Sequence, residues 1–419
     1  MLKDVIRSLK NDKIRTFFCW LTFTITSLFI FLFFVVAMSK AVGVKMVNGA
    51  SDIPSILMLT SVIICSIEIV FANDFFVKNK ARELAIRLVC GSTYAQNASF
   101  LLLQVVVVLV FALPIGIGVA LALVPVINTI LVNMMNSSTT VSINASSVIW
   151  AIAVLGFVIF WTMILNLSFS YRNSASQLLN SNTLKLSKGT TTSVGGNVGK
   201  VILKLIHLFI FIAPLFLGYH DTRLLFPCVV ASIFGFLYVL DDFIVPMLNK
   251  LIHSTMSNSK SLISLGFFRS DISVLRMNLM MNIVSSALLI MLLSMSDKAV
   301  YKILILITYI CINLLLSLSL LFKYANEITE RIGKFKTLSH LGFVDKVKKR
   351  IIVKEVFDLY LYLGLMIVLY LIYIFVSYGN VGLVSNAHMI VLALGNVIPH
   401  ILCGVVILVY YLKTVMKGN

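Results

Sequence analysis

Ten long apolar runs constrain this chain more than any other feature of its sequence. Each is close to the roughly 20 residues that an α-helix needs to cross a bilayer core. The runs are continuously apolar and do not alternate, so they indicate spanning helices and exclude barrel strands. The composition agrees, because 60% of the residues are hydrophobic and only 12% are charged, which excludes a soluble enzyme and a disordered chain. The runs fall near residues 17–38, 54–76, 100–124, 148–170, 203–219, 224–246, 275–296, 301–322, 356–377 and 388–412.

The distribution of positive charge predicts the orientation of these spans. The chain has 34 Lys and Arg residues against 16 Asp and Glu residues. With the N-terminus inside, the inner segments carry 29 of the cations and the outer segments carry 5. Lys and Arg gather in cytoplasmic loops, so both termini are expected in the cytoplasm. The longest outer loop, near 125–147, has no charged residue and is too short to fold as a domain.

Two amphipathic segments with similar sequences precede the first and seventh spans. In residues 1–16 the apolar side chains share one face of a predicted helix, opposite Lys and Arg, which is typical of an elbow helix lying in the inner interface. Residues 260–276 have the same character. The sequence Lys-Asn-Asp ending at Asp12 aligns with Arg-Ser-Asp ending at Asp271, at an offset of 259 residues.

A second pair of similar segments follows the second and eighth spans. Residues 83–91 align with residues 334–342 at an offset of 251, and the shorter loop before the eighth span accounts for the change of offset. The chain therefore reads as an internal duplication. We predict a first repeat over 1–180, a linker with two connecting spans over 181–256, and a second repeat over 257–419, each repeat with an elbow and four spans.

These residues resemble the FtsX/MacB-like permeases of ATP-binding cassette (ABC) transporters. The family's cytoplasmic segment reads like EIGILKALGAS, and residues 83–92 read ELAIRLVCGS. The second copy, KFKTLSHLGF over 334–343, matches more loosely and lacks the acidic start. Ten spans in two such units resemble the permeases of bacitracin- and lantibiotic-type peptide transporters. The chain departs from that group in having only residues 296–300 where those proteins carry a large extracellular domain.

The resemblance implies a permease subunit in a bacterial plasma membrane. No GxxxxGK[ST] phosphate loop is present, so ATP and Mg²⁺ are expected on two copies of a separate ATPase chain, with no cofactor in this one. The implied substrate is an amphipathic peptide, such as an antimicrobial peptide or bacteriocin, or a lipid-like molecule that is exported or cleared. An alternative is a signalling protein that passes ATPase motion to a sensor kinase or another partner.

Two cytoplasmic segments, 80–97 and 328–350, are the candidate coupling helices. The functional interpretation is that each docks in a groove of the ATPase. The alternative is an ordinary solvated loop whose cations only set the topology. The residues assigned to coupling are Arg82, Glu83, Leu84, Ile86, Arg87 and Gly91 in the first segment, and Arg331, Lys334, Phe335, Leu338 and Gly342 in the second.

Glu68, inside the second span, is the candidate intramembrane polar residue. A carboxylate is costly in hydrocarbon, so it should face the bundle or a watery cavity. It either contacts a substrate or proton, or makes a hydrogen bond between packed helices. The histidines have no metal-ligand spacing, and no nucleophile is paired with a base, so neither a metal site nor a catalytic site is predicted. The basic loops lie beside a membrane that attracts the same charge, and no nucleic-acid partner is expected.

Overall fold

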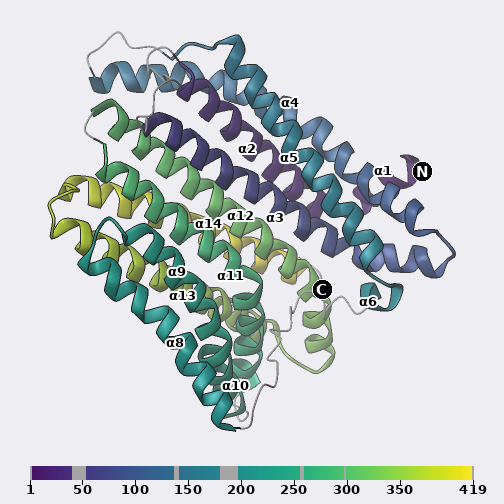
Figure 1. Cartoon of the computed structure of the whole chain (residues 1–419). Coiled ribbons are helices and arrows are strands. Elements are labelled where there is room, and N and C mark those ends of the chain that lie inside the picture. The colour runs from purple at the N-terminus through teal and green to yellow at the C-terminus, as the bar shows by residue number, and fades with distance from the viewer. Residues whose placement is uncertain are drawn as a thin grey trace. The chain divides into compact units, whose positions relative to one another are not determined.

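The computed structural model describes residues 2–39, 53–135, 141–179, 197–254, 259–296 and 299–417. Within these ranges every regular element is a helix (Figure 1). Ten helical stretches are long and apolar enough to cross a membrane, which confirms the predicted all-α, multi-pass membrane protein with ten spans. Residues 181–196 of the predicted linker region and residues 136–140 of the predicted outer loop lie outside the described residues.

The described residues form thirteen α-helices and one π-helical turn. In chain order they are α1 (Leu2–Asn11), α2 (Lys13–Ala37), α3 (Ile53–Val89), α4 (Tyr94–Met135), α5 (Ala145–Arg172), α6 (Ala175–Leu179), α8 (Asn197–His220), α9 (Leu225–Val239), the π-helical turn η1 (Leu240–Ile244), α10 (Val245–Ser254), α11 (Ser259–Ser294), α12 (Ala299–His340), α13 (Asp345–Gly379) and α14 (Asn386–Lys417).

The chain divides into two compact units. The first comprises Met1–Ser187 and Ser296–Leu315, and the second comprises Lys188–Met295 and Leu316–Asn419. The first unit therefore contains the whole of the first predicted repeat. The second contains the connecting spans together with the second predicted repeat, apart from the part of α12 that belongs to the first unit.

In the first unit α2 is the central helix, packed against α3, α4 and α5 (Figure 1). Its sequence is apolar around the whole circumference, as expected of a helix enclosed on all sides. Small residues let α4 approach it closely. A Cβ added at Gly116 would lie 2.0 Å from Ser27 Oγ and 2.5 Å from the Thr24 backbone oxygen. The buried hydroxyls of α2, including Ser27, bond to carbonyls of their own helix, so their burial leaves no donor unsatisfied.

The predicted elbows differ between the two halves. α1 is a separate helix that ends at Asn11, and α2 begins at Lys13. Of the apolar side chains on its predicted face, Val5 and Leu9 are buried, whereas Leu2 and Ile6 are exposed. The segment predicted as the second elbow, 260–276, is instead the first part of α11, which continues without a break into the seventh span.

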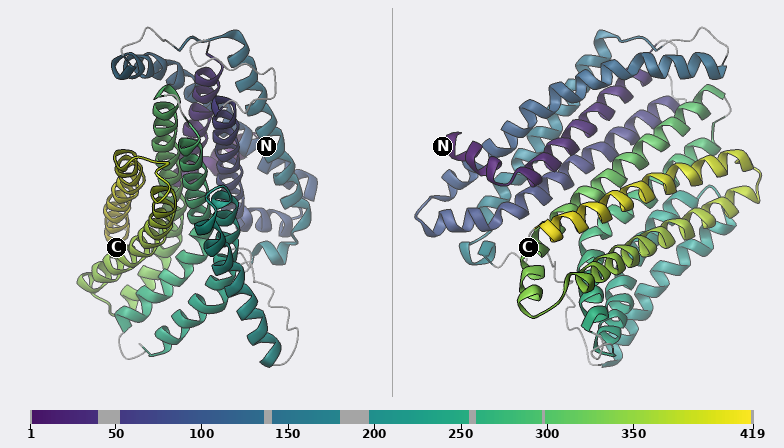
Figure 2. Two further views of the ribbon diagram at one scale, coloured as in Figure 1. Left: turned by 60° about the vertical axis from the view of Figure 1, so that its left-hand side comes forward. Right: turned by 180° about the vertical axis from the view of Figure 1, so that it is seen from behind.

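In the second unit α8 and α9 form a tight pair, and α11 packs against α9 and α13. α13 and α14 run side by side (Figure 2). Gly235 sets the α8–α9 distance, because a Cβ there would lie 2.6 Å from the Phe211 backbone nitrogen. At η1, consecutive carboxylates reach different helices: Asp242 lies 2.5 Å from His207 Nδ1 on α8, and Asp241 lies 3.5 Å from Arg276 on α11.

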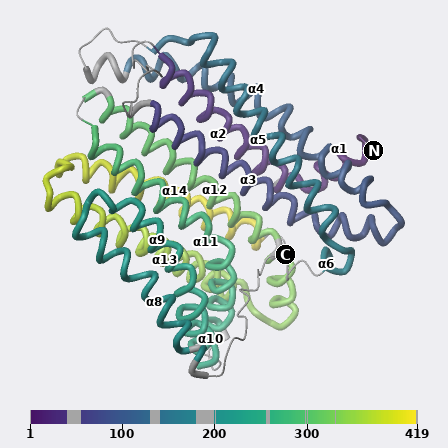
Figure 3. Tube along the Cα trace, in the orientation of Figure 1, coloured from purple at the N-terminus to yellow at the C-terminus, as the bar shows by residue number. Residues whose placement is uncertain are grey.

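The helices that flank the predicted coupling segments are much longer than a bilayer requires. α3, α4, α12 and α13 contain 37, 42, 42 and 35 residues. At about 1.5 Å per residue they extend roughly 52–63 Å, against about 30 Å of hydrocarbon. The predicted coupling segments are therefore not separate short helices. They are the ends of spanning helices, and the chain reverses at each of them in a tight turn (Figure 3).

Candidate coupling site

The first hairpin tip joins α3 to α4 through a glycine cap. Gly91 has a φ of +96°, a conformation that glycine adopts without strain. Its backbone N–H donates to the Leu88 carbonyl at 3.1 Å, and the N–H of the next residue donates to the Arg87 carbonyl at 3.0 Å. α4 then begins with a capping box, in which the Thr93 and Gln96 side chains each accept from the other's backbone N–H. Both helix ends are thus satisfied within three residues.

The second hairpin tip, between α12 and α13, repeats the glycine cap 251 residues later, although α13 begins without a side-chain cap. Gly342 has a φ of +86°. Its N–H donates to the Ser339 carbonyl, and the Phe343 N–H donates to the Leu338 carbonyl, both at 3.0 Å. Lys348, on the first turn of α13, donates to Ser339 Oγ at 2.7 Å and so ties the two helices together. The glycine turn within each predicted coupling segment therefore has the same pair of backbone hydrogen bonds in both halves.

Both tips expose apolar side chains. Val89 and Leu341 are each 70% exposed, and Ile86 and Val344 are also exposed. These positions lie at the ends of helices, beyond the apolar runs and among cationic residues. These side chains give each tip an apolar surface with cationic residues around it. We call the two surfaces tip 1 (residues 82–94) and tip 2 (residues 334–346).

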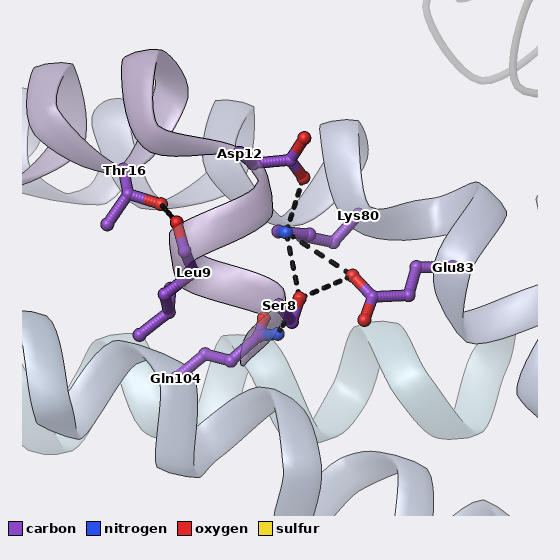
Figure 4. A network of polar contacts seen from close by, with 7 residues as sticks. All are labelled: Ser8, Leu9, Asp12, Thr16, Lys80, Glu83 and Gln104. Atoms are coloured by element: carbon purple, nitrogen blue, oxygen red, sulfur yellow. Dashed lines mark hydrogen bonds and ion pairs between the residues drawn. The ribbon is translucent and has the colours of Figure 1, made fainter. Parts of the chain in front are cut away.

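Behind tip 1, a buried lysine joins α3 to the elbow. Lys80 is 2% exposed, and its Nζ lies 2.5 Å from Asp12 Oδ2 and 3.3 Å from Glu83 Oε2 (Figure 4). It also donates to Ser8 Oγ at 3.1 Å, and Ser8 receives a further bond from Gln104 of α4 at 2.9 Å. Asp12 and Glu83 are 38% and 32% exposed, so water reaches the carboxylates although it does not reach the ammonium.

Behind tip 2, a buried arginine joins α12 to α11 and α13. Arg331 is 2% exposed and forms ion pairs with Asp271 of α11 and Glu355 of α13, both fully buried. Tyr324 donates to Glu355 at 2.7 Å and Tyr411 of α14 donates to it at 3.2 Å. One guanidinium therefore binds two carboxylates from two other helices, and two phenols complete the hydrogen bonding of one of them.

The two clusters occupy equivalent positions in the predicted internal duplication. In each cluster a cation lies eleven residues before the capping glycine. The cation pairs with the aspartate at the end of the aligned three-residue sequence, Lys-Asn-Asp or Arg-Ser-Asp. The helix after the tip supplies a third polar residue at the same offset. The equivalent pairs are Lys80 with Arg331 and Gln104 with Glu355, both at an offset of 251, and Asp12 with Asp271 at 259.

The predicted coupling residues divide between the tip surfaces and the clusters behind them. Those exposed are Arg82, Ile86, Gly91, Lys334 and Gly342, those buried are Leu84, Phe335 and Arg331, and those partly exposed are Glu83, Arg87 and Leu338. Arg87 Cζ lies over the Phe100 ring, 3.4 Å from its centroid, so its charge is held against α4. Arg331 is enclosed and does not contribute to an outer face.

Sequence reasoning missed the buried partners Lys80, Gln104 and Glu355. The sequence carries a signal for them, because the two cations stand at the same offset of 251 residues as the two glycines. The aspartates were aligned in the repeat, but a role was not assigned to them.

Glu68 lies fully buried in the first unit, as expected of a carboxylate within a span. A larger intramembrane polar cluster lies in the second unit and was not predicted. His400 of α14 is 3.0 Å from Ser317 Oγ of α12 through its Nδ1. One turn earlier, Asn396 donates to Asn282 Oδ1 and to Ser286 Oγ of α11, both at 3.1 Å.

A groove of about 470 Å³ opens beside this cluster, between α13 and α14. Its walls are apolar apart from Asn396, His400 and Tyr360. The Tyr360 ring lies against Gly404, where a Cβ would be only 3.1 Å from it. Ligand pockets of this size are commonly apolar with a few polar groups. Among the described residues, no three His, Cys, Asp or Glu side chains come together to hold a metal ion.

No model of a known protein family matches the chain, and no curated protein is significantly similar to it.

Proposed function

We propose that the chain is the permease subunit of an ABC transporter in a bacterial plasma membrane, with both termini and both tips in the cytoplasm. The observation that carries this proposal is the duplicated tip and cluster. Each half has a helical hairpin that is longer than the bilayer, a capped tip with exposed apolar side chains, and a buried cation behind the tip. We call each long hairpin, with its tip, a lever. Two such levers suit a membrane protein whose helices are moved from one side of the membrane by a separate ATPase.

The tips are the proposed docking surfaces for the ATPase. Val89 of tip 1 and Leu341 of tip 2 would enter apolar grooves of the partner, with Arg82 and Lys334 at the polar rim. One chain has two tips, so it binds two ATPase copies. ATP and Mg²⁺ belong to those copies, and this chain supplies no catalytic residue.

The buried clusters are the proposed route of transmission. A displacement of tip 1 moves α3, and Lys80 carries that movement to Asp12 at the start of α2, the central helix of its unit. A displacement of tip 2 moves α12, and Arg331 carries it to α11 and α13. Helices are stiff along their axes, and the enclosed pairs of Arg331 break only at considerable cost, so α12 moves with α11 and α13. The pairs of Lys80 have partly exposed carboxylates and hold α3 to Asp12 less firmly.

The proposed substrate is an amphipathic peptide or a lipid-like molecule. The groove between α13 and α14 supports this class, because it combines long apolar walls with hydrogen-bonding groups from Asn396 and His400 inside a span. A molecule taken from the bilayer would place its apolar part against those walls.

Co-purification tests the proposal most directly. The full chain, isolated from its native membrane in a mild detergent, should retain a P-loop ATPase at two copies per chain, measured by mass spectrometry. Val89→Asp and Leu341→Asp should each remove one copy, because a carboxylate in an apolar groove is unpaired. Val381→Asp is the matched control, since Val381 is also an exposed turn residue beside a glycine of positive φ, at the opposite end of α13.

Two results would overturn this proposal. If no ATPase is recovered from intact membrane complexes, the chain is not the permease of an ABC transporter. If Val381→Asp loses as much ATPase as the tip variants, the tips are not the surface that binds the ATPase. An ATPase that binds at the tips but is never stimulated by peptides or lipids, together with a co-purifying kinase, would instead favour the signalling alternative.

A further inference from the structure

A groove of about 630 Å³ lies in the first unit where α3 meets α5 and α6. Val70, Phe71 and Phe169 supply apolar walls, and Asp74, Lys78 and Arg172 supply charge. It contains none of the tip residues and none of the cluster residues behind the tips. Its chemistry is therefore separate from the proposed coupling surfaces.

The groove lies at the level where the hydrocarbon region ends. On α3 the apolar run finishes near residue 76, and Lys78 is the first cation after it. On α5, Arg172 is the last residue of a helix whose other 27 residues carry no charge. Two cations at the ends of adjacent spans stand at the depth of the lipid headgroups. This placement holds whichever side of the membrane is cytoplasmic.

The charges in the groove are not balanced. Lys78 Nζ lies 2.7 Å from Asp74 Oδ2, so these two residues form an ion pair. Arg172 is exposed and has no ion-pair or hydrogen-bond partner among the described residues. Its planar guanidinium presents several donors that match the oxygens of a phosphate group.

The floor of the groove is polar but neutral. Asn73 of α3 donates to Asn166 Oδ1 of α5 at 2.6 Å, and Asn166 donates back to Asn73 Oδ1 at 3.2 Å. Both amides are 1% exposed. This reciprocal pair fixes the distance between the two helices, so the groove is held open by the fold and needs no ligand to form it.

We propose that this groove binds the headgroup of an anionic phospholipid, with its phosphate on Arg172. Lys78 lies beside the phosphate, and one acyl chain follows the apolar wall formed by Phe71 and Phe169. A lipid with net negative charge complements the uncompensated guanidinium, whereas a zwitterionic lipid brings its own ammonium group into a groove that is already cationic. Basic pockets between spanning helices bind anionic headgroups for this reason.

The test is lipid binding to the full chain, measured by native mass spectrometry in detergent. The probes are phosphatidylglycerol and phosphatidylcholine of identical acyl chains. The unaltered chain should retain phosphatidylglycerol in preference. Arg172→Gln should weaken that binding about fivefold, the value of one cation near a lipid surface. Asp74→Asn frees Lys78 and adds net charge, so it should tighten binding by a similar factor.

The decisive result is that Arg172→Gln weakens phosphatidylglycerol binding whereas Asp74→Asn tightens it. Both side chains are at least partly exposed, so neither change is expected to unfold the chain. Lys250→Gln is the matched control, because Lys250 is an exposed cation in α10, outside this groove. Equal retention of the two lipids, or no difference between Arg172→Gln and the control, would overturn the proposal. Displacement of the lipid by millimolar inorganic phosphate would assign the groove to a soluble anion instead.

Discussion

Replacing Arg331 by methionine should destabilise the second unit severely. Methionine keeps an unbranched apolar stem and removes the charge. Asp271 and Glu355 are then left fully buried and close together with no cation between them. Removing one partner of a buried ion pair typically costs about 3–5 kcal/mol, because the remaining charge is desolvated and unpaired.

The equivalent change in the first unit should cost much less. In Lys80→Met the orphaned carboxylates are Asp12 and Glu83, which are 38% and 32% exposed. Water can solvate them once the ammonium has gone. The loss is then of the size of a partly exposed ion pair, about 1 kcal/mol.

Thermal unfolding of the full chain in one detergent measures both effects. For a unit of this size each kcal/mol corresponds to about 2–4 °C in melting temperature. Arg331→Met should therefore lower it by roughly 6–20 °C, and Lys80→Met by roughly 2–4 °C. A triple variant with Asp271→Asn, Arg331→Met and Glu355→Gln should recover most of the loss, because no buried charge is left unpaired.

Two outcomes contradict this reasoning. If Arg331→Met and Lys80→Met shift the melting temperature equally, the enclosure of the carboxylates does not control the cost. If the triple variant is as unstable as Arg331→Met alone, the loss comes from missing packing or hydrogen bonds of the guanidinium, and unpaired charge does not explain it.

Five further substitutions test other features of the packing by the same unfolding measurement. Gly116→Ala should cost about 1–3 kcal/mol because the new methyl group meets the backbone of α2, whereas Gly118→Ala, two residues along α4 with nothing within 4 Å, should be neutral or stabilising. Gly342→Ala should cost about 1–2 kcal/mol through its positive φ alone, since its surroundings are equally empty. Tyr360→Phe should not lower the free energy of unfolding, because that buried hydroxyl has no hydrogen-bond partner among the described residues. Tyr370→Phe should lower it by about 1 kcal/mol, because the 2.8 Å hydrogen bond to Ser232 is lost. Equal costs for the two tyrosines would contradict this reasoning.

The spans were predictable from the sequence and the helix ends were not. A bilayer requires a continuous apolar run, so each of the ten runs identifies a helix. Past the run, residues 77–89 are mixed in polarity, and nothing in them requires α3 to stop. The helix continues until Gly91, where a left-handed residue ends it. The glycine had been recognised as a motif position, but its meaning as the physical end of a spanning helix became clear only from its backbone conformation.

The buried cations show a different limit of sequence reasoning. Arg331 stands in a segment rich in lysine, and composition favours solvation for any cation in such a segment. Its burial depends on Asp271 and Glu355, which lie 60 and 24 residues away in the chain and meet it only when α11, α12 and α13 pack. Single-residue properties cannot reveal such a site. The duplication could have revealed it, because a cation at one offset and an aspartate at the other occur in both halves.

The two halves are equivalent in position but differ in mechanical character. In the first, the cation reaches Asp12, which lies in the break between α1 and α2, and its carboxylates are open to water. In the second, the cation reaches Asp271 within one continuous helix, and both carboxylates are enclosed. Under the proposed function, equal displacements of the two tips have unequal effects. The first can be absorbed by a pivot at Asp12, whereas the second passes directly into α11, so the second half is the stiffer lever of the pair.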